Sequence, residues 1–324
     1  MREAWQRADA AITLGAAEAA ELLRPALGDV AVAALEPLGG GKSNTNIRVR
    51  LSGAPHDVVL RLYQRDPGQM RKEAALSRRL AGQVPVPVYR HCGTRPVNGA
   101  AYAVVAWIEG RPLEAMARGA GESDLRFAGH EVGRVLAAIH GVTFAQAGFL
   151  DGDLNIHPFP GGSSSAGFLA TTFEGIAGER LGRPLAAEVV AFAEANEHRL
   201  AAWSQPPRLT HFDFGGSNIL LRDDFSVAAV VDWEFAASAS PPPDFGNLLR
   251  PPLGLSTAFV EGVADGYRAA GGFLPEDWRA LTRLADMSAW ADFLSRPFAG
   301  DALIADAQQI LRQTIAPVSG HATP

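Results

Sequence analysis

Along roughly the first hundred residues, apolar and polar positions alternate with the two-residue period of β-strands. The alternation is clear over 46–51 and 57–63, where one face of each segment is apolar. Further strands are expected at 30–38, 88–92 and 101–108. Helical spacing replaces the alternation at 13–27 and 67–81. This region therefore predicts an antiparallel sheet of about five strands accompanied by two helices.

After Gly110 the apolar residues follow the spacing of α-helices. The segment 123–140 places Leu125, Val132, Leu136 and Ile139 on one side of a long helix. More helices are expected at 168–181, at 184–203 and through most of 244–315, with short β-like segments at 208–210, 219–221 and 227–231. The segment 151–168 is rich in Gly, Pro and Ser and is expected to be a loop.

The change in pattern predicts an α+β protein with two lobes. Residues 1–108 would form a small lobe around an antiparallel sheet, and residues 109–324 would form a larger, mostly helical lobe.

Composition narrows the class of protein. In a chain of 324 residues, 47% of the residues are hydrophobic and 20% charged, which excludes a mainly disordered chain. The single cysteine, Cys92, excludes an internal disulfide and a multi-cysteine zinc site. The longest apolar run, 100–108, is too short to span a bilayer, and no signal peptide is recognisable. We therefore expect a cytoplasmic protein without a membrane partner.

Charge is distributed unevenly along the chain. The net charge of −6 argues against a nucleic-acid partner. Residues 1–110 carry 14 basic and 10 acidic side chains, whereas 111–324 carry 15 basic and 25 acidic ones. This asymmetry fits an anionic ligand on the first part and a cationic one on the second, although chance variation of surface charge explains it equally well.

A glycine-rich loop joins the first two predicted strands. Backbone amides of glycines can approach a phosphate closely, and polar neighbours can add donors. A Walker A loop is excluded, because Glu36 stands where its first glycine is needed and a strand follows the loop. A strand–loop–strand hairpin over phosphates remains, and the alternative is a simple hairpin turn. The candidate phosphate-binding residues are Gly39, Gly40, Gly41, Ser43 and Asn44.

Arg61 and Glu73 form the second candidate group. Arg61 lies on a predicted strand, on the same face as Val59 and Tyr63, and Glu73 lies on the helix that follows. A strand cation supported by a helix carboxylate can hold nucleotide phosphates. The alternative is an exposed arginine on an edge strand.

The segment 209–221 carries the strongest signal for catalysis. His211 ends a predicted strand, Asp213 follows in a tight loop, and Asn218 comes five residues later, before another strand. Aspartate and asparagine at this spacing are typical of phosphoryl transfer, where the aspartate takes the proton of the substrate hydroxyl and the asparagine binds a metal. The alternative is that both residues stabilise turns.

A second metal ligand is expected at Asp232, 19 residues after Asp213 and at the end of an apolar run. Asp244 belongs to the string Asp-Phe-Gly, but it enters a predicted helix rather than leaving a strand, so we interpret it as a helix cap or loop brace. The histidines have no metal-ligand spacing, and no Gly-x-Ser-x-Gly motif supports covalent catalysis.

Together these motifs resemble the aminoglycoside phosphotransferase and choline kinase family of small-molecule kinases. The resembling segments are 38–49, 58–63, 72–81, 84–89, 103–113, 132–140, 209–221 and 230–236. The resemblance implies a two-lobed protein-kinase-like fold that binds ATP and Mg²⁺ between the lobes and transfers the γ-phosphate to a hydroxyl group.

Carried onto this chain, the resemblance assigns a role to each candidate residue. Asp213 would be the catalytic residue with His211 beside it, Asn218 and Asp232 would bind the metal, and Glu73 would be the helix carboxylate. The hinge that binds adenine would consist of Ala106, Trp107 and Ile108. Arg61 stands where many members carry lysine, which leaves the choice between ATP and GTP open.

The sequence thus predicts a kinase acting on a small-molecule hydroxyl acceptor. The acidic second part favours a cationic acceptor, such as an aminoglycoside-like antibiotic, an amino alcohol or a related metabolite. Candidate residues of its pocket are Asp151, Asp153, Glu174, Asp286, Asp292, Trp290 and Phe293. The alternative is a non-catalytic nucleotide-binding relative, while a protein kinase is disfavoured because only 12 residues separate Asp232 from Asp244. The oligomeric state is left open.

Overall fold

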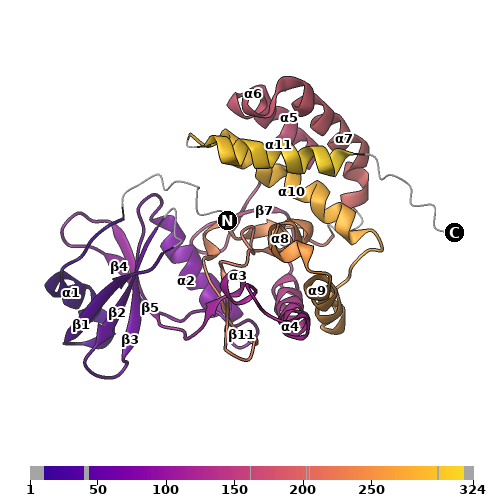
Figure 1. Cartoon of the computed structure of the whole chain (residues 1–324). Helices are drawn as coiled ribbons and strands as arrows, with labels where there is room; N and C mark the ends of the chain where they lie inside the picture. Colours follow the sequence, from indigo (N-terminus) through magenta and orange to yellow (C-terminus); the bar gives the residue numbers. More distant parts are fainter. Residues whose placement is uncertain are drawn as a thin grey trace.

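A five-stranded antiparallel sheet forms the first part of the chain in the computed structural model (Figure 1). Its strands are β1 (Val32–Pro37), β2 (Thr45–Leu51), β3 (Asp57–Leu62), β4 (Tyr89–Thr94) and β5 (Ala101–Ala106). They lie in the order β1-β2-β3-β5-β4, and all neighbours are antiparallel. The structure describes residues 11–39, 44–160, 162–201, 203, 205–297 and 299–316.

The two faces of this sheet have different partners. Helix α1 (Ala16–Leu27) packs Leu22 and Leu23 against one face, where they meet the apolar side of β3 that includes Leu60. The opposite face, which carries Arg61, is turned toward the rest of the molecule. Helix α2 (Gly68–Leu80) lies between that face and the helical part of the chain (Figure 1). The alternation seen in the sequence therefore separates a core face from a face that can carry chemistry.

The second part of the chain is mostly helical. Its helices are α3 (Leu113–Met116), α4 (Glu122–His140), α5 (Ser165–Glu174), α6 (Ile176–Leu181), α7 (Arg183–Ala201), α8 (Pro242–Leu248), α9 (Thr257–Ala269), α10 (Trp278–Ser295) and α11 (Asp301–Ile315), with short 3₁₀ turns η1 (Trp233–Phe235) and η2 (Leu253–Leu255). Two small antiparallel sheets lie among them. One has the order β11-β10-β6 and the other β8-β7-β12-β9.

The strands of these small sheets are only two to four residues long. They are β6 (Arg111–Pro112), β7 (Gly148–Leu150), β8 (Ile156–His157), β9 (Arg208–Thr210), β10 (Ile219–Leu221), β11 (Val227–Val230) and β12 (Ala237–Ala239). The sequence indicated β9, β10 and β11 but not the other four. A two- or three-residue strand carries too little alternation to be recognised, and only pairing with distant segments makes it a strand.

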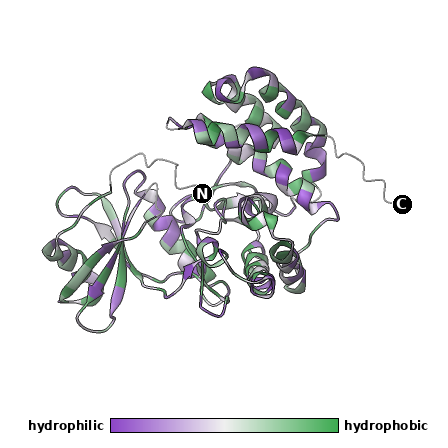
Figure 2. Ribbon diagram, in the orientation of Figure 1, coloured by the Kyte–Doolittle hydropathy of each residue, from purple (hydrophilic) through white to green (hydrophobic). Residues whose placement is uncertain are grey.

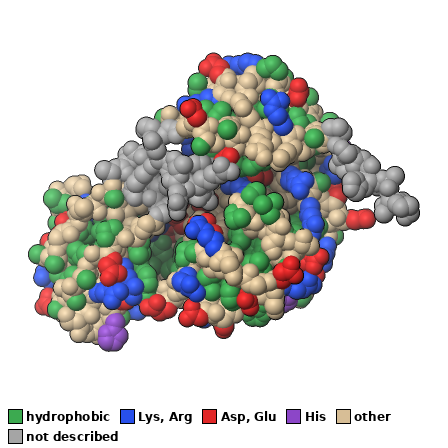
Figure 3. Space-filling view, viewed as in Figure 1, with side chains coloured by type: hydrophobic (Ala, Val, Ile, Leu, Met, Phe, Trp, Pro, Cys, Tyr) green, Lys and Arg blue, Asp and Glu red, His purple; other side chains and the backbone are tan. Residues whose placement is uncertain are grey.

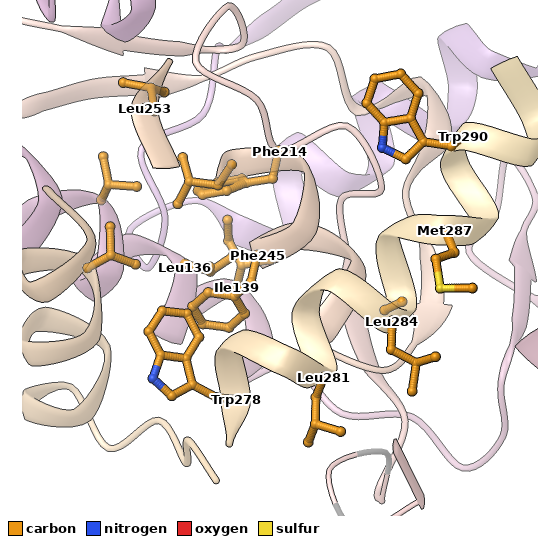
Figure 4. Packing of buried hydrophobic residues seen from close by; sticks show 14 of the residues in the cluster. Leu136, Ile139, Phe214, Phe245, Leu253, Trp278, Leu281, Leu284, Met287 and Trp290 are labelled. Atoms are coloured by element: carbon orange, nitrogen blue, oxygen red, sulfur yellow. The ribbon is translucent and has the colours of Figure 1, made fainter. Parts of the chain in front are cut away.

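The largest hydrophobic core joins the helices of the second part. Figure 4 shows Phe245 of α8 packed among Leu136 and Ile139 of α4 and Trp278 of α10. In Figure 2, green and purple alternate along these helices, as expected when one side of each helix is buried. Among the described residues, no helix is both long enough and apolar enough to cross a membrane.

Helices α4 and α9 approach each other closely through glycines, and they run side by side in Figure 1. A Cβ atom at Gly129 or Gly133 of α4 would lie within 2.3 Å of a carbonyl oxygen of α9. The same holds in reverse for Gly262 and Gly266 of α9. Backbone contact of this kind is possible only without a side chain. This close packing places the C-terminal end of α4 next to α9.

Two boundaries differ from the sequence prediction. The expected loop at 151–168 contains β8 and the start of α5, because the side chain of Ser164 caps that helix by accepting a hydrogen bond from the backbone of Gly167. The helix expected at 168–181 is divided at Gly175, whose extended backbone ends α5. The boundary between residues 108 and 109 stays a prediction.

Candidate active site in the cleft

A cleft of about 2360 Å³ separates the five-stranded sheet from the helical part. Figure 3 shows it as a hollow between these two regions, with hydrophobic side chains visible inside it. One end is lined by residues of β3 and β5 and by the connector after β5. The other end is lined by residues of α5, α10 and the loops between β7 and α5. We call these the sheet end and the helix end of the cleft.

Arg61 is the central charge of the sheet end. Its guanidinium donates two hydrogen bonds of 2.8 Å to the carboxylate of Glu73 and one of 2.5 Å to Asp232. Burial opposes the charge of Arg61, but Glu73 and Asp232 outweigh it, so the pKa of Arg61 is raised well above its usual value. The predicted pairing of Arg61 with Glu73 is present, and the contact with Asp232 adds a second carboxylate that the sequence did not indicate.

Glu73 is held by more than Arg61. The hydroxyl of Tyr63 donates a short hydrogen bond to its carboxylate, and the hydroxyl of Tyr89 donates one of 3.0 Å. Burial and the neighbouring Glu73 raise the pKa of both tyrosines well above the usual value, so both stay protonated donors. A carboxylate with a bidentate guanidinium and two phenol donors is fixed in place, and it fixes Arg61 in turn.

Asp213 lies in the loop between β9 and β10 and is held by two asparagines. Asn218 donates to one carboxylate oxygen at 2.8 Å, and Asn247 of α8 donates to the other at 3.1 Å. Burial and the nearby charge of Asp232 raise the pKa of Asp213, while His211 and the two asparagines act in the opposite direction. The spacing correctly predicted that Asp213 and Asn218 lie together, whereas no role was expected for Asn247.

His211 is buried beneath this loop rather than facing the cleft. Its Nε2 lies 3.1 Å from the carbonyl oxygen of Val231, and its Nδ1 accepts a hydrogen bond of 3.3 Å from the backbone amide of Asp213. Both ring nitrogens therefore join backbone groups of the loops that carry Asp213 and Asp232.

Asp244 holds the same loop from below. Its carboxylate accepts hydrogen bonds of 2.8 Å from the backbone amides of His211 and Phe212. It also contacts Nε2 of His140 at 3.1 Å, and Nδ1 of His140 lies 2.9 Å from the hydroxyl of Tyr267. The interpretation of Asp244 as a brace is confirmed by these contacts. The close packing of α4 on α9 brings His140 to Tyr267.

Two residues of the site have an unusual backbone. Phe212 and Asp232 have φ angles of 62° and 66°, in the left-handed region that favours glycine. Such strain persists only where the surroundings impose it, and it is common at functional sites. Phe212 is held by Asp244 through its amide and by Asn247 through its carbonyl oxygen.

The glycine-rich loop is described only at its two ends. Gly39 lines the cleft. Gly40, Gly41 and Ser43 lie outside the described residues. Asn44 is buried, and its amide donates to the carboxylate of Glu234 at 2.7 Å, a position that differs from the expected contact with a phosphate.

The expected hinge follows β5 directly. Ala106, Trp107 and Ile108 all line the cleft. The ring of Trp107 lies under the guanidinium of Arg48, 3.9 Å from the ring centre, and its Nε1 donates to Glu109 at 2.7 Å. The indole is therefore engaged by Arg48 of β2 and by Glu109 of the connector.

Helix α2 is anchored to the second part of the chain. The ammonium of the buried Lys72 donates to the carbonyl oxygen of Glu234 at 2.5 Å. Burial lowers its pKa, although Glu73 and other nearby carboxylates act against this. Arg71 reaches Asp153 at 3.0 Å across the surface. These contacts fix the helix that carries Glu73, and nothing in the sequence pattern indicated them.

The expected acceptor-pocket residues are separated by the structure. Asp151 has its pKa lowered by hydrogen bonds from His157 and from the backbone amides of Asn155 and Asp153, and Asp153 is paired with Arg71. Glu174 lies outside the lining of the cleft, at the end of α5. The four expected residues that do line the helix end all come from α10: Asp286, Trp290, Asp292 and Phe293.

Comparison with protein families gives one match. The model of a family described as the phosphotransferase enzyme family matches residues 34–284 of the chain. No curated protein sequence matches the chain.

Solved structures of low sequence identity share the fold. A thermostable mutant of aminoglycoside phosphotransferase APH(4)-Ia, in a ternary complex with ADP and hygromycin B, matches with a TM-score of 0.68 at 19% identity, over 93% of this chain and 99% of that chain. The GDP complex of wild-type aminoglycoside 2'-phosphotransferase-IIIa matches with a TM-score of 0.69 at 17% identity, over 93% and 99%. These likenesses confirm the predicted two-lobed α+β fold of the protein-kinase type.

Proposed function

Because this chain belongs to the phosphotransferase enzyme family, we propose that it transfers the γ-phosphate of ATP to a hydroxyl group of a small molecule, with Mg²⁺ as the metal. The observation that carries the proposal is the meeting of Arg61, Asp232 and Asp213 with Asn218 in one cleft. A cation for phosphates, oxygen ligands for a metal and a carboxylate for a hydroxyl proton are the parts that phosphoryl transfer needs.

Asp213 is the proposed catalytic residue. The acceptor oxygen forms a bond to the γ-phosphorus, the bond from that phosphorus to the β,γ-bridging oxygen breaks, and ADP leaves. The hydroxyl proton passes to the carboxylate of Asp213. Its hydrogen bonds to Asn218 and Asn247 orient that carboxylate, so we assign both asparagines a positioning effect on Asp213.

Asn218 and Asp232 fit a magnesium ion. The amide nitrogen of Asn218 is directed to Asp213, which leaves its oxygen as a ligand. Asp232 adds a carboxylate, and its strained backbone holds that group in the cleft. No cluster of three His, Cys, Asp or Glu side chains suitable for a metal occurs among the described residues. This suits Mg²⁺, which binds through one or two protein groups together with substrate phosphates and water. When bound, the ion would neutralise phosphate charge.

Arg61 is the proposed phosphate cation, and Glu73 sets its position. The backbone of 106–108 is the proposed site for the base, and the glycine-rich loop is proposed to cover the phosphates. ATP is our choice of nucleotide; structures of the same fold contain ADP, AMP-PNP or GDP, so GTP is the second nucleotide to test.

For the acceptor and for the location in the cell, we propose only a general class. The acceptor is a small hydroxyl compound, as in the solved complexes that contain hygromycin B or kanamycin. The expectation of a cationic acceptor rested on five carboxylates, of which only Asp286 and Asp292 line the cleft, each paired with an arginine. A cationic acceptor is therefore not part of the proposed function. A cytoplasmic location and the lack of a nucleic-acid partner stay predictions from composition.

One observation favours the alternative of a non-catalytic nucleotide-binding protein. Arg61 donates to the same carboxylate that a magnesium ion needs, Asp232, at 2.5 Å. In the catalytic proposal, bound nucleotide draws Arg61 toward the phosphates and frees Asp232 for the ion. In the alternative, the ion pair persists and nucleotide binds without turnover.

The test is ADP formation by the purified protein across hydroxyl compounds of different charge and polarity, with Mg²⁺ and with a chelator. Acceptor-dependent ADP release that requires Mg²⁺ and is lost in Asp213→Asn supports the kinase. The matched control is Asp223→Asn, which changes an exposed aspartate in a turn outside the cleft. Nucleotide binding that is independent of Mg²⁺, with no turnover for any acceptor, supports the non-catalytic alternative.

A further inference from the structure

Charges at the helix end of the cleft are already compensated. Arg250 donates to both carboxylate oxygens of Asp286 at 2.5–3.1 Å, and Nε1 of Trp290 adds a hydrogen bond of 2.8 Å. Arg296 pairs with Asp292 at 2.7 Å. Asp306, the remaining carboxylate of this end, is buried and has a partner of its own. A polycation would have to break these pairs, because it needs uncompensated carboxylates.

Exposed phenylalanines also line the cleft. Six phenylalanines are prominent among the exposed large hydrophobic side chains of the described residues, and four of them line the cleft. The four are Phe149, Phe168, Phe212 and Phe235, with 53%, 45%, 36% and 45% of their surface exposed. Apolar surface gathered in a concave site indicates a ligand that covers it.

The backbone of Phe212 has a conformation that is unfavourable for phenylalanine. A bulky residue with a φ of 62° is an outlier, because its Cβ is crowded in the left-handed region. Glycine or asparagine would adopt this conformation at less cost. Asp244 and Asn247 nevertheless fix both backbone polar groups of Phe212, directly before Asp213. The strain holds an aromatic ring in the cleft beside the catalytic carboxylate.

Strand pairing places the other phenylalanines around this point. β9 and β12 are antiparallel with Thr210 opposite Ala237, so Phe212 and Phe235, each two residues beyond that pair, come to the same end of the sheet. Phe149 of β7 is opposite Ala237 on the other side of β12, and Phe159 meets Phe149 edge to face at 4.7 Å. Three segments of this sheet thus bring Phe149, Phe212 and Phe235 to one end of it, where the loop of Asp213 begins.

We propose that the acceptor presents a flat, uncharged apolar ring next to the hydroxyl that is phosphorylated, and that Phe212 is the specificity-determining residue that contacts this ring. The inference rests on the proposed function for the chemistry, which is the transfer already described. It adds that the ring of the acceptor, rather than a set of ammonium groups, provides the binding energy. Stacking and burial of one ring supply that energy.

The experiment measures binding and turnover separately. Binding of 1-pyrenemethanol is followed by its fluorescence, and benzyl alcohol, 2-naphthalenemethanol and kanamycin are used as competitors. ADP formation with Mg·ATP is measured for the same compounds. The variants are Phe212→Gly and Phe212→Asn, which relieve the backbone strain and so keep the loop folded. The matched control is Phe127→Ala, which removes an exposed phenylalanine of α4 outside the cleft.

The expected result is that affinity rises with ring size, that kanamycin competes least, and that both Phe212 variants weaken binding about tenfold or more. Affinity for Mg·ATP and the binding by Phe127→Ala should match the unmodified protein. Equal binding by the Phe212 variants, or tighter binding of kanamycin than of the ring alcohols, would overturn the inference. If ring alcohols bind through Phe212 but no ADP forms, the proposed function is contradicted. If kanamycin is phosphorylated and Phe212→Gly does not change its turnover, the proposed function holds and the inference about the ring is overturned.

Discussion

The two ends of the cleft use charge in opposite ways. At the sheet end, Arg61 joins two carboxylates, Glu73 and Asp232, and Asp213 lies close enough for Asp232 to raise its pKa. Among the described residues of this end, three carboxylates thus surround a single guanidinium. At the helix end, Arg250 and Arg296 each neutralise one aspartate, and Phe168 of α5 and Phe293 of α10 add aromatic surface.

From this difference we expect the sheet end to carry out the reaction and the helix end to select the acceptor. An excess of carboxylates suits an end that takes up Mg²⁺ together with phosphates, since the ion supplies the missing positive charge. Neutral pairs among aromatic rings suit an end that binds a ligand by area rather than by charge. Changes at one end should therefore leave ligand binding at the other end intact, and the variants at Arg61 and Arg250 test this.

The largest effect is expected from Asp213→Asn. The amide cannot take the hydroxyl proton, so turnover should fall about 10²–10⁴-fold with every acceptor. Steady-state ADP release measures this. A residual activity above one tenth of the original would show that Asp213 is not the catalytic base.

The same variant should be more stable than the original at neutral pH. Burial and Asp232 raise the pKa of Asp213, so the folded protein binds this proton more tightly than the unfolded chain. Stability from this group is therefore lost as pH rises from the usual value of 3.8 through the raised value. The advantage of Asp213→Asn in thermal unfolding should disappear when the pH is lowered through this range, and an advantage independent of pH would contradict the cause.

Arg61→Met should be the most damaging change to stability. It leaves the buried carboxylate of Glu73 without its cation, which costs about 3–5 kcal/mol. Denaturant unfolding measures the loss, and titration with Mg·ATP should show weakened binding. Arg61→Lys is the control that keeps the charge but loses the bidentate geometry. Unchanged affinity for pyrenemethanol is expected in both, and a loss there would break the separation of the two ends.

Arg250→Met is the corresponding change at the helix end, where it removes the cation that pairs with Asp286. Asp286 would keep only the hydrogen bond from Trp290, and the guanidinium 5.0 Å from the centre of the Phe293 ring would be lost. We expect a destabilisation of about 1–3 kcal/mol and a raised KM for the acceptor. The KM for ATP should stay the same. An equal rise in both constants would show that the two ends act as one unit.

Asn247→Ala tests the residue that touches both ends. Asn247 donates to Asp213 and accepts from Arg250 at 3.0 Å. Its hydrogen bond lowers the pKa of Asp213, so its removal should raise that pKa further. The acidic limb of the pH profile of kcat/KM should move to higher pH, with a smaller change on the plateau. A uniform loss at all pH values would indicate a structural effect alone.

Arg71→Ala should have the smallest effect. The pair of Arg71 with Asp153 is about two-thirds exposed on both sides, and such pairs contribute little. The change in unfolding free energy should stay within about 0.5 kcal/mol. A larger loss would mean that α2 depends on this contact in addition to the buried Lys72.

Local signals explain which parts of the site the sequence could predict. Asp213 and Asn218 are five residues apart in one loop, and the strands on either side confine them to one place. Arg61 and Glu73 belong to consecutive elements, and their pairing was expected correctly. Asn247 comes 34 residues after Asp213 and carries no signal, because an asparagine on a helix has many possible roles.

The pairing partners of the carboxylates were the least predictable feature of the site. An acidic second half suggested a cationic acceptor, yet a count of charges does not show which are paired. Arg250 and Asp286 are 36 residues apart and meet only because α8 packs on α10. The contact of Asn44 with Glu234 is likewise absent from the local pattern, because the two residues are 190 positions apart.

By itself, the sequence determined the sheet, the main helices, the loop that brings Asp213 to Asn218 and the class of chemistry, since these follow from apolar period and from residues close together along the chain. Tertiary structure alone decided that Arg61 reaches Asp232, that Asn247 holds Asp213, and that Arg250 neutralises Asp286. These contacts join residues 34 to 171 positions apart. Their free energy depends on distance and burial, which are properties of the folded chain and not of its local pattern.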